Sequence, residues 1–174
     1  YQLTKDIADY TAISVASFPA KQDVIVASRM TISEPTELFL IDAKSGVSNQ
    51  ITFTNKEFLS GFKLAEVKKR MVPSTDGKEI LTWVIYPPDF DPTKKYPTLL
   101  YCQGGPESTV SQFFSYRWNF QLMAANGYII VAPNRRGLPG FGSKWNDDIV
   151  GDWGGQPMRD LLSAIDDVSK ESYV

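Results

Sequence analysis

Two adjacent glycines near the middle of the chain are the clearest candidates for contact with a reacting group. Gly104 and Gly105 stand between Gln103 and Pro106, directly after the mainly apolar run 97–101. Because glycine has no Cβ and accepts unusual φ values, a backbone N–H in such a turn can approach a substrate carbonyl closely. The Gln103 side chain could shape the same pocket or only hydrogen-bond the loop. The turn is therefore a candidate oxyanion-binding loop, with an ordinary strand-to-loop turn as the alternative.

A second candidate loop follows the apolar run 128–132, where Asn134, Arg135 and Arg136 stand in sequence. Open α/β sheets place their sites at the carboxyl ends of parallel strands, and a guanidinium there can fix a neighbouring loop through paired hydrogen bonds. A structural clamp without substrate contact is the alternative. Glu107 could meet a substrate amine, although a solvated loop carboxylate is the more ordinary interpretation.

The chain lacks the residues that would complete a serine nucleophile site. It contains no histidine, so it cannot hold a Ser-His-Asp triad. No serine has glycine at both −2 and +2, so a G-x-S-x-G turn is missing as well. We therefore expect this chain to be part of an enzyme, cut before the nucleophile, with nucleophile, acid and base all downstream. Alone, it should be inactive.

Composition indicates a globular chain and excludes several classes of function. The 174 residues are 43% hydrophobic and 22% charged with a net charge of −2, so neither disorder nor nucleic-acid binding is expected. No run approaches the ~18 apolar residues that a membrane span needs. The single cysteine, Cys102, excludes an intrachain disulfide and a Cys-rich metal site, and its place in an apolar run predicts burial.

The chain changes character near residue 62. Before that point, short β-branched runs alternate with turn signals such as 42–46, which predicts an antiparallel sheet of roughly four strands. About 60 residues make a marginal sheet alone, because both edges and both faces are open. One unit of a repeat array, such as a propeller blade, is the better interpretation.

After residue 62 the pattern becomes a hairpin followed by β-α alternation. Runs 98–101 and 128–132 should be adjacent, buried, parallel strands, since a helical crossover separates them. Because covering elements are missing from the second half, we also expect 128–132 to present an exposed apolar edge. The other predicted elements are hairpin strands at 66–72 and 79–86 and helices at 113–126 and 156–172, the last with one apolar face.

Three ordered motifs resemble the prolyl oligopeptidase family of serine peptidases: 101–106, 134–142 and 152–155, the last followed by Asp160. The lead-in 74–80 with its two prolines at 87–88 is similar to this family's entry into its catalytic domain. The resemblance implies a mixed fold, in which the end of a β-propeller (1–61, the last blade) is followed by the N-terminal half of an α/β-hydrolase domain (62–174).

The resemblance also implies an activity and roles for the candidate residues. The parent protein would be a serine peptidase of the dipeptidyl peptidase and acylaminoacyl peptidase-like branch, cleaving oligopeptides through an acyl-enzyme with no metal and no organic cofactor. The Gly105 N–H would donate to the tetrahedral oxyanion, and Gly104 and Gln103 would complete the loop. At the position of Gln103, relatives often carry His or Tyr. Its partners would be an oligopeptide substrate and the remainder of its own catalytic domain, in the periplasm or cytoplasm of a bacterium.

Two other classes of function stay open at this point. One is a non-catalytic relative that binds a partner, and the other is an α/β-hydrolase esterase. A G-x-S-x-G motif downstream would favour an enzyme over the binding protein, and a comparison of ester and peptide substrates would separate the esterase.

Overall fold

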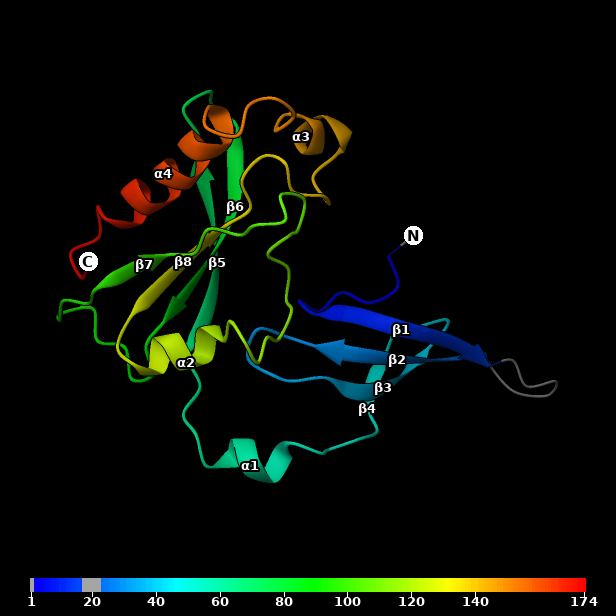
Figure 1. Cartoon of the computed structure of the whole chain (residues 1–174). Helices are drawn as coiled ribbons and strands as arrows, with labels where there is room; N and C mark the ends of the chain where they lie inside the picture. The colour runs from blue at the N-terminus through cyan, green and yellow to red at the C-terminus, as the bar shows by residue number, and fades with distance from the viewer. Residues whose placement is uncertain (1, 17–22) are drawn as a thin grey trace. The chain divides into compact units, whose positions relative to one another are not determined.

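A computed structural model describes residues 2–16 and 23–174, and the chain forms two compact units (Figure 1). The first unit contains residues 1–63 together with the segment 111–119, and the second contains residues 64–110 and 120–174. Because the units are defined by compactness alone, the assignment of 1–61 to a propeller blade and of 62–174 to a hydrolase domain stays a prediction.

The first unit is built on an antiparallel sheet, and in the described residues it has the four strands that the sequence predicts. They pair in chain order: β1 (Asp9–Ala16), β2 (Val24–Met30), β3 (Glu37–Asp42) and β4 (Ser48–Gln50). Phe39 and Ile41 of β3 are buried whereas Leu38 is exposed, which is the period-2 pattern of a strand with one buried face. A short helix, α1 (Lys56–Ser60), follows the sheet in the chain.

The second unit contains a mixed sheet in the order β5-β6-β8-β7. The strands β5 (Glu66–Pro73) and β6 (Glu79–Tyr86) form the predicted hairpin, and β6 pairs antiparallel with β8 (Ile129–Pro133). The strand β7 (Thr98–Leu100) pairs parallel with β8, so the predicted parallel neighbours are confirmed. Three helices accompany this sheet in the described residues: α2 (Phe120–Ala125), α3 (Ser143–Asp147) and α4 (Gln156–Val168).

The core of the second unit lies between the sheet and helix α4, which runs along one face of it (Figure 1). Ile129 and Val131 of β8 pack there with Ala164 and Val168 of the helix. Ile130 alternates to the opposite face and is also fully buried. Removing such side chains from water stabilises a fold by about 1.5–3 kcal/mol each. The sheet is therefore a firm support for the loops that follow its strands.

Two predictions about burial are wrong, each for a topological reason. Strand β7 is not fully buried: Leu99 is 41% exposed, because β7 is an edge strand of the sheet that the structure describes. The expected exposed edge at 128–132 is not found either, because β8 lies between β6 and β7 and its residues 129–132 are buried.

Two predicted helices are shorter, and Cys102 differs from its prediction. Instead of 113–126, helix α2 covers only Phe120–Ala125, because the segment 111–119 belongs to the first unit. Helix α4 ends at Val168 rather than 172, and Met158, which the sequence assigns to its apolar face, is 46% exposed. Cys102 is exposed, since its strand ends two residues earlier.

A polar network joins three elements of the second unit. The Arg136 guanidinium donates to both carboxylate oxygens of Asp76 at 2.7 and 2.6 Å, and Asp76 lies in the hairpin turn between β5 and β6. Asp160 of helix α4 is fully buried and accepts from the Arg136 N–H at 2.9 Å and from Ser74 Oγ at 2.5 Å. The network therefore fixes the hairpin turn, the loop after β8 and helix α4 to one another.

The same network changes the ionisation of its members. The hydrogen bonds from Arg136 lower the pKa of the Asp76 carboxyl to about 2. Burial alone would lower the pKa of the Arg136 guanidinium, but its hydrogen bonds to Asp76 and the charge of Asp160 outweigh burial and raise that pKa. Both shifts favour the charged forms, so the pair contributes to stability as an ion pair.

We expect Asp76→Asn to remove a pH-dependent part of the stability. The pKa of Asp76 is lower in the folded state than its ordinary value of 3.8, so its contribution is present above that value and is lost as pH falls towards 2. Since Asp76 is partly exposed, the contribution above pH 5 is about 1 kcal/mol, of which roughly half is lost by pH 3.

The measurement is the free energy of unfolding of the whole protein and of Asp76→Asn between pH 5 and pH 3. Asp166→Asn, which changes an exposed carboxylate of helix α4, is the control and should follow the wild type. A difference between Asp76→Asn and the wild type that does not shrink on acidification would contradict the assignment.

Candidate active site

The loop that follows β7, residues 101–110 and here called the Gly-Gly loop, requires glycine at one position. Gly105 has φ +132°, a region that side chains with a Cβ rarely adopt. A Cβ placed there would lie 3.0 Å from Ser108 Cβ and 3.1 Å from the Glu107 nitrogen. At Gly104 an added Cβ would meet nothing within 4 Å. The backbone geometry at position 105 thus requires glycine, whereas Gly104 borders open space.

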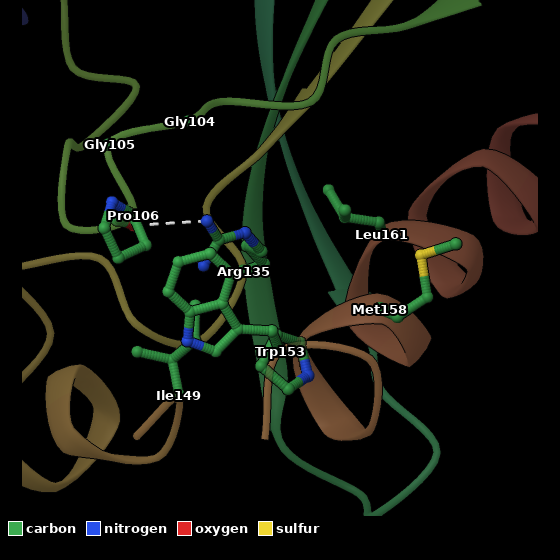
Figure 2. A pocket seen from close by; sticks show the side chains of 9 residues that line it. Gly104, Gly105, Pro106, Arg135, Ile149, Trp153, Met158 and Leu161 are labelled. Carbon is green, nitrogen blue, oxygen red and sulfur yellow. Dashed lines mark hydrogen bonds between the residues drawn. The ribbon is translucent and has the colours of Figure 1, made fainter. Parts of the chain in front are cut away.

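Arg135 binds the first half of the Gly-Gly loop. Its Nη2 donates to the carbonyl oxygens of Gln103 and Pro106, both at 3.1 Å, and its Nη1 donates to the Arg136 carbonyl at 2.6 Å. The side chain is buried, and burial lowers the pKa of its guanidinium. Figure 2 shows the Arg135 side chain directed toward the loop at Pro106. This guanidinium therefore bridges the two residues that flank the glycines.

Asn134 binds the far end of the same loop. Its side chain is fully buried, its Oδ1 accepts from the Val110 N–H at 2.9 Å, and its Nδ2 donates to the Val110 carbonyl at 3.0 Å. Trp83 of β6 donates its indole N–H to the same carbonyl at 2.9 Å. The Gly-Gly loop is therefore held at both ends by side chains from the neighbouring strands of the sheet.

A cavity of about 380 Å³ opens beside the glycines (Figure 2). Gly104, Gly105, Pro106 and Arg135 form one side, and Met158 and Leu161 of helix α4 lie across from them. Ile149, Trp153 and Pro157 complete the lining. A hollow with largely apolar walls and a few placed polar groups is the usual form of a small-molecule site.

The sequence-predicted residues separate into two groups. Gly104, Gly105 and Arg135 line the cavity, and the Gln103 carbonyl is bound by Arg135. Arg136 instead faces Asp76 and Asp160, and Glu107 is exposed on the loop and is not among the lining residues. Whether any of these residues acts in catalysis stays a prediction.

Sequence reasoning missed several residues of the surroundings, among them Asp76, Trp83 and Trp153. Asp76 looks like an ordinary Asp-Gly turn residue in the sequence, and Trp83 looks like one more apolar strand position. Only the pairing of β6 with β8 brings Trp83 within reach of the Gly-Gly loop. Trp153 has a weak signal, its place in the motif 152–155. Within residues 2–16 and 23–174, no cluster of three or more His, Cys, Asp or Glu side chains could bind a metal.

The fold and the loop together define a class: an α/β sheet with a candidate oxyanion loop, together with an antiparallel β-unit. Several known proteins are similar to this chain. Residues 114–174 match the model of the Prolyl oligopeptidase family. Dipeptidyl-peptidase 5 of Porphyromonas gingivalis is 50% identical over 173 residues, which are 99% of this chain and 25% of that relative. Dipeptidyl-peptidase 5 of Porphyromonas endodontalis is 47% identical over 173 residues, 99% of this chain and 24% of that relative.

Solved structures of two acylaminoacyl peptidases are similar to this chain in fold. An acylaminoacyl peptidase in complex with Z-Gly-Gly-Phe-chloromethyl ketone superposes with a TM-score of 0.81 at 24% identity, covering 97% of this chain and 25% of that one. The acylaminoacyl peptidase of Pyrococcus horikoshii gives 0.80 at 25% identity, covering 95% and 25%. The resemblance to the prolyl oligopeptidase family is supported by the family model over residues 114–174, and the relatives and solved structures match nearly the whole chain. The chain spans about a quarter of the length of the curated relatives it matches.

We expect Arg135→Met to loosen the Gly-Gly loop without unfolding the sheet. The variant keeps a buried side chain of similar length but loses the hydrogen bonds to Gln103 and Pro106. Hydrogen exchange of the whole protein should show protection at the amides of 103–105 and 107–110 reduced by about 10-fold, because local opening becomes easier. Arg159→Met, an exposed arginine on helix α4, is the matched control. Unchanged protection in Arg135→Met would show that the guanidinium does not hold the loop.

Proposed function

We propose that this chain is part of a serine-type peptidase that cleaves oligopeptides through an acyl-enzyme. The first unit would be the last blade of a β-propeller, and the second would be the N-terminal half of an α/β-hydrolase domain. The remainder of the catalytic domain would supply the nucleophile, acid and base, because this sequence has no histidine and no G-x-S-x-G motif. The relatives named dipeptidyl-peptidase 5 support a peptide substrate.

The observation that carries this proposal is the backbone of Gly105. It stands after the parallel strand β7, at the carboxyl end where open α/β sheets place their sites. Its φ of +132° favours glycine, and it borders the cavity. Such a backbone N–H can donate to the oxygen of a tetrahedral intermediate, where negative charge develops during acyl transfer.

The chain's own residues would act by binding and positioning. When a serine oxygen adds to the substrate carbonyl, the carbonyl oxygen becomes an oxyanion, and the Gly105 N–H would stabilise it. Arg135 and Asn134 would keep that N–H in place beforehand, so that no reorganisation is needed as the charge develops. Arg136 would fix this loop to the fold through Asp76 and Asp160.

We expect Gly105→Ala to reduce kcat by at least about 10²-fold on a dipeptidyl chromogenic substrate, since removing one oxyanion donor has this effect in serine peptidases. The added Cβ would crowd Ser108 and Glu107, and a φ of +132° is strained for alanine, so the N–H would be displaced. Steady-state kinetics of the whole protein is the measurement, with folding checked by thermal melting. Glu107→Gln is the control and should retain most of its turnover, because Glu107 is an exposed loop carboxylate.

The outcomes test the oxyanion assignment, the role of Glu107 and the class of function separately. A folded Gly105→Ala protein that keeps most of its kcat would show that this N–H is not an oxyanion donor. If Glu107→Gln lost substrate affinity instead, Glu107 would anchor the substrate amine. Ester substrates measured in parallel distinguish an esterase, and the absence of turnover on every substrate would favour a binding protein.

A further inference from the structure

Arg135 is a buried cation that has no carboxylate partner within residues 2–16 and 23–174. It is 7% exposed, and backbone carbonyl oxygens accept its hydrogen bonds. Arg136 differs, because Asp76 and Asp160 both lie within ion-pair distance of it. Burial lowers the pKa of the Arg135 guanidinium, so its charge lacks the compensation that Arg136 has. Since buried charges in proteins are usually paired, this charge would attract an anion.

The Arg135 guanidinium also has a donor left for a ligand. Its bonds to the backbone carbonyls use Nη1 and Nη2, whereas Nε has no acceptor in the described part of the chain. All three guanidinium nitrogens carry N–H groups. The side chain lines the cavity beside the Gly-Gly loop, and Met158 and Leu161 of helix α4 lie across from it (Figure 2). Because apolar walls strengthen the attraction between opposite charges, the cavity favours an anionic ligand.

The proposed reaction would itself produce an anion at this place. Water adds to the ester of the acyl-enzyme, the serine leaves with a proton, and the acyl part becomes a carboxylic acid. At neutral pH this acid gives its proton to solvent and becomes a carboxylate. One of its oxygens is the former carbonyl oxygen, which the Gly105 N–H would have held. Gly105 and Arg135 line the same cavity, so the new carboxylate would form beside an uncompensated guanidinium.

We propose that Arg135 binds the carboxylate of the peptide released from the acyl-enzyme, and that this peptide therefore inhibits the whole protein until it dissociates. This inference rests on the proposed function, because the carboxylate forms in the cavity only if acyl transfer occurs there. Arg135 would keep its bonds to the Gly-Gly loop and use its remaining donor for the product. A peptide of the same sequence without a carboxylate would lack this ion pair.

The test compares two ligands of the whole protein by titration calorimetry. One is the dipeptide that forms the acyl part of the chromogenic substrate, and the other is its alcohol, in which CH₂OH replaces the carboxylate. We expect the wild type to bind the dipeptide at least about 10-fold more tightly than the alcohol, because hydrogen bonds between charged groups are the strong ones. In Arg135→Met this preference should fall below about 2-fold.

The ratio of the two affinities separates anion binding from the support of the loop. A loosened Gly-Gly loop weakens both ligands, whereas a lost ion pair weakens only the carboxylate. Arg159→Met removes an exposed arginine of helix α4 and should keep the full preference. If Arg135→Met does not fold, a crystal structure of the wild-type complex gives the answer. A nitrogen of Arg135 should then lie about 3 Å from a carboxylate oxygen of the dipeptide.

Several results would overturn the inference without touching the proposed function. If the wild type binds the dipeptide and the alcohol equally, a carboxylate elsewhere in the whole protein already compensates Arg135. If Arg135→Met keeps the preference, or if Arg135 lies more than about 4 Å from the carboxylate in the crystal, another group binds the product. In each case a loss of kcat in Gly105→Ala still supports the oxyanion assignment. If Gly105→Ala instead keeps its kcat, the proposed function fails, and the reason for a carboxylate to occupy this cavity fails with it.

Discussion

Asn134 and Arg135, which follow strand β8, bind the backbone of the loop that follows strand β7. This is possible because β7 and β8 are parallel neighbours, so their carboxyl ends meet at the same edge of the sheet. Arg135 bridges the carbonyls of Gln103 and Pro106, and Asn134 pairs with both backbone groups of Val110. A loop that contains two glycines would otherwise have many conformations. The shape of the candidate site therefore depends on these bonds.

The two consecutive buried arginines, Arg135 and Arg136, have different kinds of hydrogen-bond partners. A buried guanidinium is costly unless its N–H groups find partners. Arg135 bonds to backbone carbonyls of the Gly-Gly loop, whereas Arg136 bonds to Asp76 and approaches the fully buried Asp160. Removing one partner of a buried pair is strongly destabilising, because the other charge is left without compensation. Arg135 thus holds the Gly-Gly loop, and Arg136 connects the loop after β8 to the hairpin turn and to helix α4.

Much of this arrangement could be predicted from the sequence because local signals and motifs agree. The antiparallel strands before residue 62 and the parallel pairing of β7 with β8 follow from turn residues and from apolar runs of the right length. The place of the arginines after a predicted parallel strand also indicated that a guanidinium could fix a neighbouring loop. Burial was harder to predict, because periodicity does not show which strand is at an edge. Leu99 and Cys102 were both expected to be buried, and both are exposed.

The contacts that cross long sequence distances could not be predicted. Trp83 reaches Val110 and Asp76 reaches Arg136 only through the sheet order, for which the sequence has no local signal. The helix expected at 113–126 failed for the same reason, since the segment 111–119 is bound by Asp9, more than 100 residues earlier. Periodicity alone assigned that segment to a helix.

The most direct test of the central claim is a crystal structure of the whole protein with a peptide aldehyde bound to its nucleophile. The account predicts that the Gly105 nitrogen lies about 3 Å from the tetrahedral oxygen, within hydrogen-bond range. It also predicts that Arg135 still bridges Gln103 and Pro106 in that complex. If other groups hold the oxygen and the Gly105 nitrogen lies more than about 4 Å away, too far for a hydrogen bond, the Gly-Gly loop is a structural turn and the oxyanion assignment is wrong.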